Sequence, residues 1–101
     1  MATYRLSARA KSDLLEIARY TQHEWGETQA KTYVRGLEEF CVLIAGFPGI
    51  GRECDEIASR LRRMEHVSHV VFFFPAADGI TIARILHKSR DISDEEFEEF
   101  N

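Results

Sequence analysis

The sequence lacks the features that mark secreted, membrane and metal-binding proteins. No apolar run approaches the roughly 20 residues of a membrane-spanning helix, and the N-terminal stretch MATYRLSARAKS contains no apolar segment of signal-peptide length. The two cysteines, Cys41 and Cys54, show no metal-type spacing. We therefore expect a cytoplasmic protein that does not contact the membrane, with both cysteines reduced and Cys41 a small core residue.

The length of the chain limits what it can contain. Its 101 residues are enough for one hydrophobic core and not for two. With 45% hydrophobic and 30% charged residues, the composition is that of an ordinary globular protein. We therefore expect a single domain over residues 1–101, and a multi-domain enzyme is excluded.

Basic side chains are outnumbered by acidic ones, 13 to 17, and are unevenly distributed. The formal net charge is −4. Residues 60–90 contain six basic and two acidic side chains, whereas residues 91–101 contain six acidic side chains and none that is basic. An acidic tail therefore follows a basic segment directly, although a solvated mixture of charges is the commoner explanation of such patterns. The tail is compatible with one short helix presenting Phe97 and Phe100, or with a mobile segment.

Two helices of nearly equal length are predicted over residues 7–46. Ser7 is a suitable N-cap, and apolar residues then recur at helical spacing as far as Trp25, which precedes Gly26. A second helical stripe covers residues 30–44. Helices joined by only one or two residues must fold back on each other, so we expect an αα-hairpin whose apolar stripes face a sheet.

Strand-like segments flank this hairpin. Residues 1–6 end in the alternating stretch TYRL, and residues 47–59 have the proline, glycines and mixed charge of a loop. Residues 60–90 contain LRRMEH, HVVFFFP and GITIARILHK, separated by turns, which predicts an antiparallel meander. The elements together predict an α+β fold of order β-α-α-β-β-β, with the helical hairpin packed on an antiparallel sheet.

No set of side chains has the spacing of a catalytic or metal centre. His66 and His69 face each other across a predicted turn, but a transition-metal site needs three or four ligands and no third is evident. His87 ends the strand that carries Arg84 and precedes Lys88. Its pKa range suits acid–base chemistry, although a structural role is commoner for a lone histidine. We expect no metal and no cofactor.

Several short motifs occur in a recognisable order. They are D-L-x-x-I at residues 13–17, W-G-x-x-Q-A at 25–30, P-x-I-G-R at 48–52 and R-I-L-H at 84–87. Together they make nearly the whole chain resemble the ParE toxins of the RelE/ParE superfamily. This resemblance implies the β-α-α-β-β-β fold. It also implies the toxin of a type II toxin–antitoxin system, which acts on DNA gyrase and is neutralised by a cognate antitoxin protein.

The same scaffold also hosts RelE-like toxins, which cut messenger RNA in the ribosome. Such a nuclease lies among RNA phosphates and favours a basic surface, whereas this chain has a pI near 5.5. Its catalytic group would have to be Arg84, His87 and Lys88. We therefore expect a protein inhibitor that is not an enzyme and reads no nucleic-acid sequence. A decayed toxin that only binds its antitoxin is a third interpretation.

Arg84 stands out because it occupies an apolar row with Ile80, Ile82 and Leu86 when the strand alternates regularly. A structural role would pair it with a helix carboxylate such as Asp13 or Glu16, as burial of a cation demands. The alternative is that Arg84 joins a basic patch for a partner. The structural role is preferred.

Candidate residues for contact with the target are exposed cations, because interface energy concentrates in a few anchors such as arginine, tryptophan and tyrosine. The basic segment supplies Arg62, Lys88 and Arg90. Trp25 is expected to be a core residue rather than a contact residue, because it continues the apolar stripe of the first helix.

Overall fold

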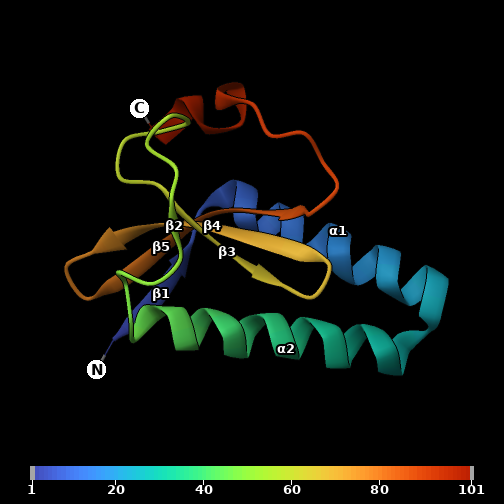
Figure 1. The fold of residues 1–101 in the computed structure, drawn as a ribbon. Helices are drawn as coiled ribbons and strands as arrows, with labels where there is room; N and C mark the ends of the chain where they lie inside the picture. The colour runs from blue at the N-terminus through green and yellow to red at the C-terminus, as the bar shows by residue number, and fades with distance from the viewer. Residues whose placement is uncertain (1, 101) are drawn as a thin grey trace.

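The computed structural model describes residues 2–100 of the chain. Two helices follow the first strand, four further strands follow the helices, and a 3-10 helix ends the described chain (Figure 1). The strands are β1 (Thr3–Leu6), β2 (Arg52–Glu53), β3 (Arg62–His66), β4 (His69–Ala76) and β5 (Gly79–His87), and the helices are α1 (Ala8–Trp25), α2 (Glu27–Ala45) and η1 (Asp94–Phe100). The expected α+β class is confirmed.

The predicted helical hairpin is present, and its caps define it. The Oγ of Ser7 accepts a hydrogen bond from the backbone N–H of Ala10 at 3.0 Å, as an N-cap does. Gly26 separates the two helices with a φ of +93°, a backbone conformation that favours glycine. No helix in residues 2–100 combines the length and the apolarity needed to cross a membrane.

The five strands form one sheet in the order β1-β5-β4-β3-β2. The meander of β3, β4 and β5 is antiparallel as expected, but β1 pairs in parallel with β5, so the sheet is mixed rather than antiparallel. A strand's own pattern reveals its two faces but not its partner. The two backbones lie so close that a Cβ on Gly79 would be 1.7 Å from the carbonyl oxygen of Thr3, which explains the glycine at the start of β5.

The second departure from expectation is β2, which lies within the predicted loop at residues 47–59. It contains only two residues and pairs antiparallel with Arg62 and Arg63 of β3. Two residues are too few to show alternation, so this strand leaves no periodic signal in the sequence.

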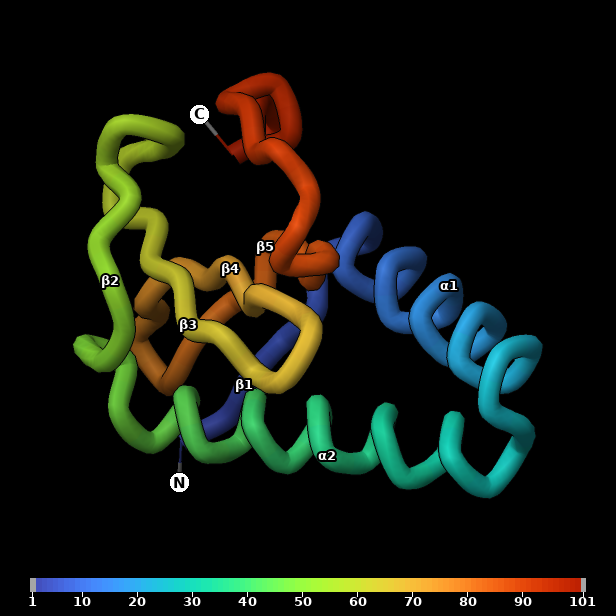
Figure 2. The backbone as a smooth tube through the Cα atoms, turned by 45° about the vertical axis from the view of Figure 1, so that its right-hand side comes forward, coloured from blue at the N-terminus to red at the C-terminus, as the bar shows by residue number. Residues whose placement is uncertain are grey.

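The sheet separates two apolar layers (Figure 2). On one face, Ile17 of α1 and Leu37 and Cys41 of α2 belong to the same core cluster as Phe73. On the other face, η1 and the loop before β3 cover the sheet, and Phe97 of η1 packs against Phe72. The tail therefore forms the short helix that the sequence allowed, with Phe97 in the core. Cys41 is a core residue as expected, and both cysteines are free.

A β-bulge in β5 changes the faces that its side chains occupy. Ile82 and Arg84 pair with consecutive residues of β4, so Ala83 between them has no partner. Leu86 consequently packs on the η1 side of the sheet, whereas Ile82 packs on the hairpin side. The expected apolar row through Arg84 is wrong, because regular alternation stops at the bulge.

Candidate functional site

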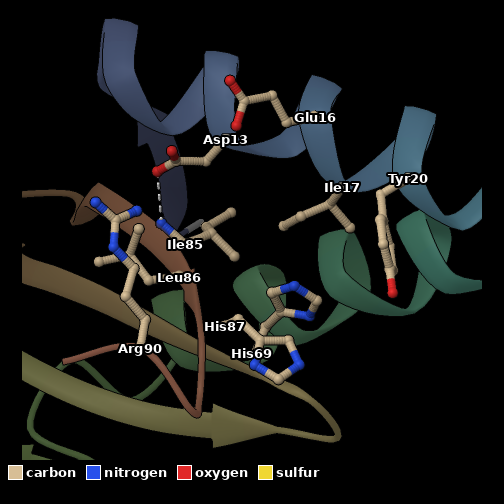
Figure 3. Close-up of a pocket in the computed structure, with 9 residues that line it drawn as sticks. All are labelled: Asp13, Glu16, Ile17, Tyr20, His69, Ile85, Leu86, His87 and Arg90. Carbon is tan, nitrogen blue, oxygen red and sulfur yellow. Dashed lines mark hydrogen bonds between the residues drawn. The ribbon is translucent and has the colours of Figure 1, made fainter. Parts of the chain in front are cut away.

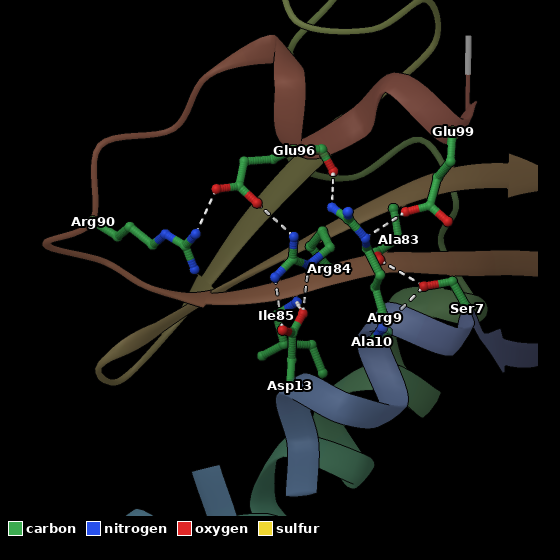
Figure 4. A network of polar contacts seen from close by, with 10 residues as sticks. All are labelled: Ser7, Arg9, Ala10, Asp13, Ala83, Arg84, Ile85, Arg90, Glu96 and Glu99. Carbon is green, nitrogen blue, oxygen red and sulfur yellow. Dashed lines mark hydrogen bonds and ion pairs between the residues drawn. The ribbon is translucent and has the colours of Figure 1, made fainter. Parts of the chain in front are cut away.

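Arg84 is buried, and a carboxylate on each side balances its charge (Figure 4). Its Nε and Nη2 donate hydrogen bonds to the two carboxylate oxygens of Asp13 on α1, each at 2.8 Å. Its Nη1 donates to Oε2 of Glu96 on η1 at 2.6 Å. The side chains of Arg84 and Asp13 are each only 9% exposed. Of the two helix carboxylates that the sequence offered, Asp13 and Glu16, it is Asp13 that pairs with Arg84.

The carboxylate of Asp13 fixes Arg84 in its charged form. It also accepts the backbone N–H of Ile85 at 3.0 Å, so one side chain holds both the guanidinium and the strand. Hydrogen bonding to Asp13 raises the pKa of Arg84 although burial opposes this. Arg90 donates to the other oxygen of Glu96. Arg84 thus links α1, β5 and η1, and its guanidinium is not free to bind a target or a phosphate.

A groove lies between the helical hairpin and the sheet, and Figure 3 shows the part of it that α1 and β5 line. It consists of two adjoining cavities of about 300 and 440 Å³, which share Tyr20, His69 and His87. We call it the hairpin groove. The remaining residues that line it are Asp13, Glu16, Ile17, Thr21, Trp25, Gln29, Tyr33, Val67, Ser68, Ile85, Leu86 and Arg90.

The rim of the hairpin groove carries exposed apolar side chains. The exposed fractions of Tyr20, Trp25 and Val67 are 67%, 72% and 67%. The expectation that Trp25 is a core residue is wrong. Trp25 is the last residue of α1, and the hairpin extends past the end of the sheet at this point (Figure 1). A helical stripe shows which face is apolar but not where the covering layer ends.

A tyrosine and two histidines meet in the hairpin groove. The Oη of Tyr33 lies 2.7 Å from Nδ1 of His69 and accepts the backbone N–H of Ser68 at 3.3 Å. The rings of His69 and His87 meet edge to face, with their centroids 5.3 Å apart. Burial, followed by the nearby His87 and His66, lowers the pKa of His69 to about 4, so this imidazole is neutral at pH 7.

Sequence reasoning missed this group. Tyr33 lies on α2, 36 positions before His69, and only the packing of α2 on the sheet brings them together. His66 and His69 do pair across the β3–β4 turn. The His66 ring packs against Phe40, with centroids 4.7 Å apart. Within residues 2–100, no three histidine, cysteine or acidic side chains are grouped in a way that would hold a metal ion.

The group considered for RNA cleavage is not assembled on one surface: His87 and Lys88 line a common pocket, but Arg84 does not. Arg84 is enclosed by its two carboxylates. His87 is exposed, and its Nδ1 lies 2.8 Å from the Oγ of Ser89. Lys88 lies outside the hairpin groove, and the pocket that it lines is shared with His87. The group therefore lacks a guanidinium that can reach a scissile phosphate.

Lys88 and Arg90 lie beside Arg52 and Arg63 around a pocket of about 420 Å³, which we call the basic pocket. Arg52 belongs to β2 and Arg63 to β3, where the two residues are direct cross-strand partners. Counting charges along the sequence indicates a basic segment. It does not reveal that the two-residue strand β2 places Arg52 beside Arg63 of that segment.

Arg62 is separate from the basic pocket. Its guanidinium donates to backbone carbonyl oxygens of the loop before β2 and to the carboxylate of Glu53, and its side chain is only 18% exposed. The carbonyl groups are those of Gly49, Ile50 and Gly51, at 2.6, 3.0 and 2.9 Å. Of the three cations expected to contact a target, two thus lie together and Arg62 cross-links a loop.

Comparisons with known proteins agree on one family. Residues 4–92 match the family model described as ParE toxin of type II toxin-antitoxin system, parDE. The chain is 40% identical over 89 residues to Toxin ParE1 of Caulobacter vibrioides, covering 88% of this chain and 92% of that protein. It is 37% identical over 95 residues to Toxin ParE of Escherichia coli, covering 91% and 90%.

The fold agrees with a solved structure as well. A chain from the chromosomal ParDE TA system of P. aeruginosa superposes with a TM-score of 0.72 at 21% sequence identity, covering 86% of this chain and 96% of that one. This likeness concerns the fold, whereas the family model and the relatives concern the sequence. The chain therefore belongs to the ParE toxin family of type II toxin–antitoxin systems.

Proposed function

We propose that this chain inhibits DNA gyrase by binding it as a protein, and that a cognate antitoxin neutralises it. The observation that carries the proposal is the match of residues 4–92 to the ParE toxin family. The surroundings of Arg84 support binding over catalysis by the group Arg84, His87 and Lys88, because the guanidinium of that group is already paired with Asp13 and Glu96.

For the antitoxin we propose the hairpin groove as the contact surface. Its rim offers Tyr20, Trp25 and Val67, and large exposed aromatic side chains are the kind that anchor interfaces. Apolar grooves beside a sheet accept extended or helical peptide segments. An antitoxin of this class supplies such a segment as a disordered tail that folds when it binds.

The target is tested with purified protein in a gyrase supercoiling assay. We expect the parent chain to block supercoiling, and the Lys88→Ala/Arg90→Ala variant to need a higher concentration, because it removes two cations of the basic pocket. Lys11→Ala/Arg19→Ala is the matched control, since it removes two exposed cations from α1. A parent chain that leaves supercoiling unchanged at a large excess over gyrase contradicts the proposal.

The second candidate is a RelE-like ribonuclease, and the observation that favours it is the Tyr33–His69–His87 group. Induction without antitoxin separates the candidates. A gyrase inhibitor produces filaments and a DNA-damage response while protein synthesis continues at first, whereas a nuclease stops translation quickly. His87→Ala leaves an inhibitor toxic but costs a nuclease roughly 10²–10⁴ in rate. A decayed toxin has no effect on growth.

A further inference from the structure

The basic pocket concentrates positive charge in a chain whose net charge is −4. Arg52 comes from β2, Arg63 from β3, and Lys88 and Arg90 from the segment after β5. β2 and β3 are neighbouring strands of the sheet, and the segment after β5 leads from the sheet to η1 (Figure 2). Two carboxylates, Glu56 and Asp91, also line the pocket, so its formal charge is +2 before His87 is counted.

Contacts within the fold hold the residues that carry these cations in place. Arg52 and Arg63 are cross-strand partners in the sheet. The guanidinium of Arg63 lies over the ring of Phe72, with its carbon 5.4 Å from the ring centroid. The backbone N–H of Lys88 donates to the carbonyl oxygen of Ser68 at 2.9 Å. The cations therefore converge on fixed elements and not on a free terminus.

Most of these charges have no partner of opposite sign. Within residues 2–100, Arg52, Arg63 and Lys88 form no ion pair, and Arg90 is the one cation of the pocket that does, with Glu96. Arg62 and Arg84 differ, because their guanidinium groups are engaged by carbonyl and carboxylate oxygens. Gathering unpaired like charges costs free energy, and an anion in the pocket removes that cost.

The charge and the lining residues of the pocket suit a phosphate ester. A phosphate monoester carries about −1.5 to −2 charges at pH 7, which matches the formal charge of the pocket. Guanidinium groups bind phosphate oxygens through two parallel hydrogen bonds. The apolar side chains of Ile57, Val70 and Ile92 also line the pocket and give a surface for the carbon part of a phosphate ester.

We propose that the basic pocket is a phosphate-binding site, which takes the backbone phosphates of a nucleic acid or the phosphate of a small ester without reading sequence. Gyrase works on DNA, so such a site on an inhibitor would contact the backbone of the target's DNA. That use rests on the proposed function, whereas binding to the free chain does not. The supercoiling assay therefore tests the proposed function, and phosphate binding to the free chain tests the basic pocket.

Binding is measured by NMR on the ¹⁵N-labelled full chain at constant ionic strength. The probes are pyrophosphate and a duplex of about 20 base pairs with arbitrary sequence. We expect both probes to shift the Nε–Hε signals of Arg52 and Arg63 and the amide signal of Lys88. Arg52→Gln/Lys88→Gln weakens binding by about tenfold or more, because it removes two charge-assisted contacts. Lys11→Gln/Arg19→Gln changes the net charge equally and leaves binding unchanged.

The two probes distinguish the source of the phosphate. Binding of both probes indicates a nucleic-acid backbone, and binding of pyrophosphate alone indicates a small phosphate ester; each supports the site. The proposal is overturned if chloride shifts the same signals as strongly, or if Arg52→Gln/Lys88→Gln binds as tightly as the parent. It is also overturned if a hexaglutamate peptide binds more tightly than either probe, because the pocket then prefers carboxylates.

Discussion

Arg62 and Arg84 are the arginines that the fold uses internally, each through several hydrogen bonds. Arg84 balances its charge against Asp13 and Glu96 in the interior, whereas Arg62 satisfies carbonyl groups of a loop. Arg52 shows the opposite situation, since its side chain is exposed and forms no ion pair within residues 2–100. The residue type alone does not separate these roles, because they depend on burial and on which oxygens lie nearby.

We expect Asp13→Ala to lower the free energy of unfolding by about 3–5 kcal/mol, because it leaves the buried Arg84 without its main partner. The remaining contact with Glu96 places the loss at the lower end of this range. Urea unfolding at pH 7 measures it. The control is Arg5→Ala, which breaks an exposed pair with Asp78 and costs no more than about 1 kcal/mol. Equal losses in the two variants would contradict a buried, structural ion pair.

His69 makes the stability of the protein depend on pH. Burial lowers its pKa in the folded protein to about 4, below the ordinary value of 6.5, so the unfolded chain binds the proton more readily. The contribution of His69 is therefore complete above pH 6.5 and is lost as the pH falls from 6.5 to 4. His69→Gln keeps a partner for Tyr33 and does not titrate.

Urea unfolding between pH 7.5 and pH 4 tests this dependence. We expect the free energy of unfolding to fall less steeply in His69→Gln than in the parent, because one protonation linked to unfolding is gone. The control is His23→Gln, which replaces a histidine whose side chain is 85% exposed. Identical slopes in the parent and His69→Gln would show that His69 titrates normally in the folded state.

At the scale of elements, η1 is part of the fold and not an appendage. Phe97 is fully buried and packs against Phe72, with ring centroids 5.1 Å apart. Glu96 of the same helix contacts both Arg84 and Arg90. The tail therefore closes the second apolar layer and pairs with one cation of the basic pocket. An acidic tail that only shields basic residues would leave the core of the sheet unchanged on removal.

We expect Phe97→Ala to destabilise the protein by about 3–5 kcal/mol, the cost of removing a large side chain from a packed core. Phe100→Ala should cost clearly less, because Phe100 is only partly buried at the edge of the same cluster. Thermal unfolding followed by circular dichroism compares the two variants. A larger effect at Phe100 than at Phe97 would show that η1 packs differently in solution.

At the scale of the whole molecule, the segment after β5 connects two surfaces. His87 and Arg90 line both the hairpin groove and the basic pocket. The groove is apolar at its rim, with Trp25 and Tyr20 exposed, whereas the pocket is cationic. Two surfaces of different chemistry therefore lie next to each other on one small protein. A ligand that fills one surface also contacts residues of the other.

We expect Tyr20→Ala/Trp25→Ala to weaken antitoxin binding by at least about 2 kcal/mol, roughly 30-fold, if these aromatic side chains anchor the interface. The proposed inhibition of gyrase should stay within a few-fold of the parent in this variant, because the basic pocket is intact. Calorimetric titration with the antitoxin and the supercoiling assay measure the two effects. Leu15→Ala is the control, since Leu15 is 52% exposed on α1 and lies outside the groove. Equal loss of both activities would mean that a single surface serves both partners.

The sequence by itself determined the local structure and the family. The helical stripes, the Ser7 cap and the Gly26 turn depend on residues within one or two turns of each other, so they are readable along the chain. The short motifs that resemble ParE toxins are local strings as well, and they identified the family. Burial of a cation in a strand also predicted that Arg84 needs a helix carboxylate such as Asp13.

Only the tertiary structure decided the rest, because it depends on contacts between residues far apart in the chain. Neither the parallel pairing of β1 with β5 nor the bulge at Ala83 follows from a strand's own pattern. The exposure of Trp25 depends on where the sheet ends beneath α1. The same holds for the candidate surfaces, since the packing of α2 brings Tyr33 to His69 and the two residues of β2 bring Arg52 to Arg63.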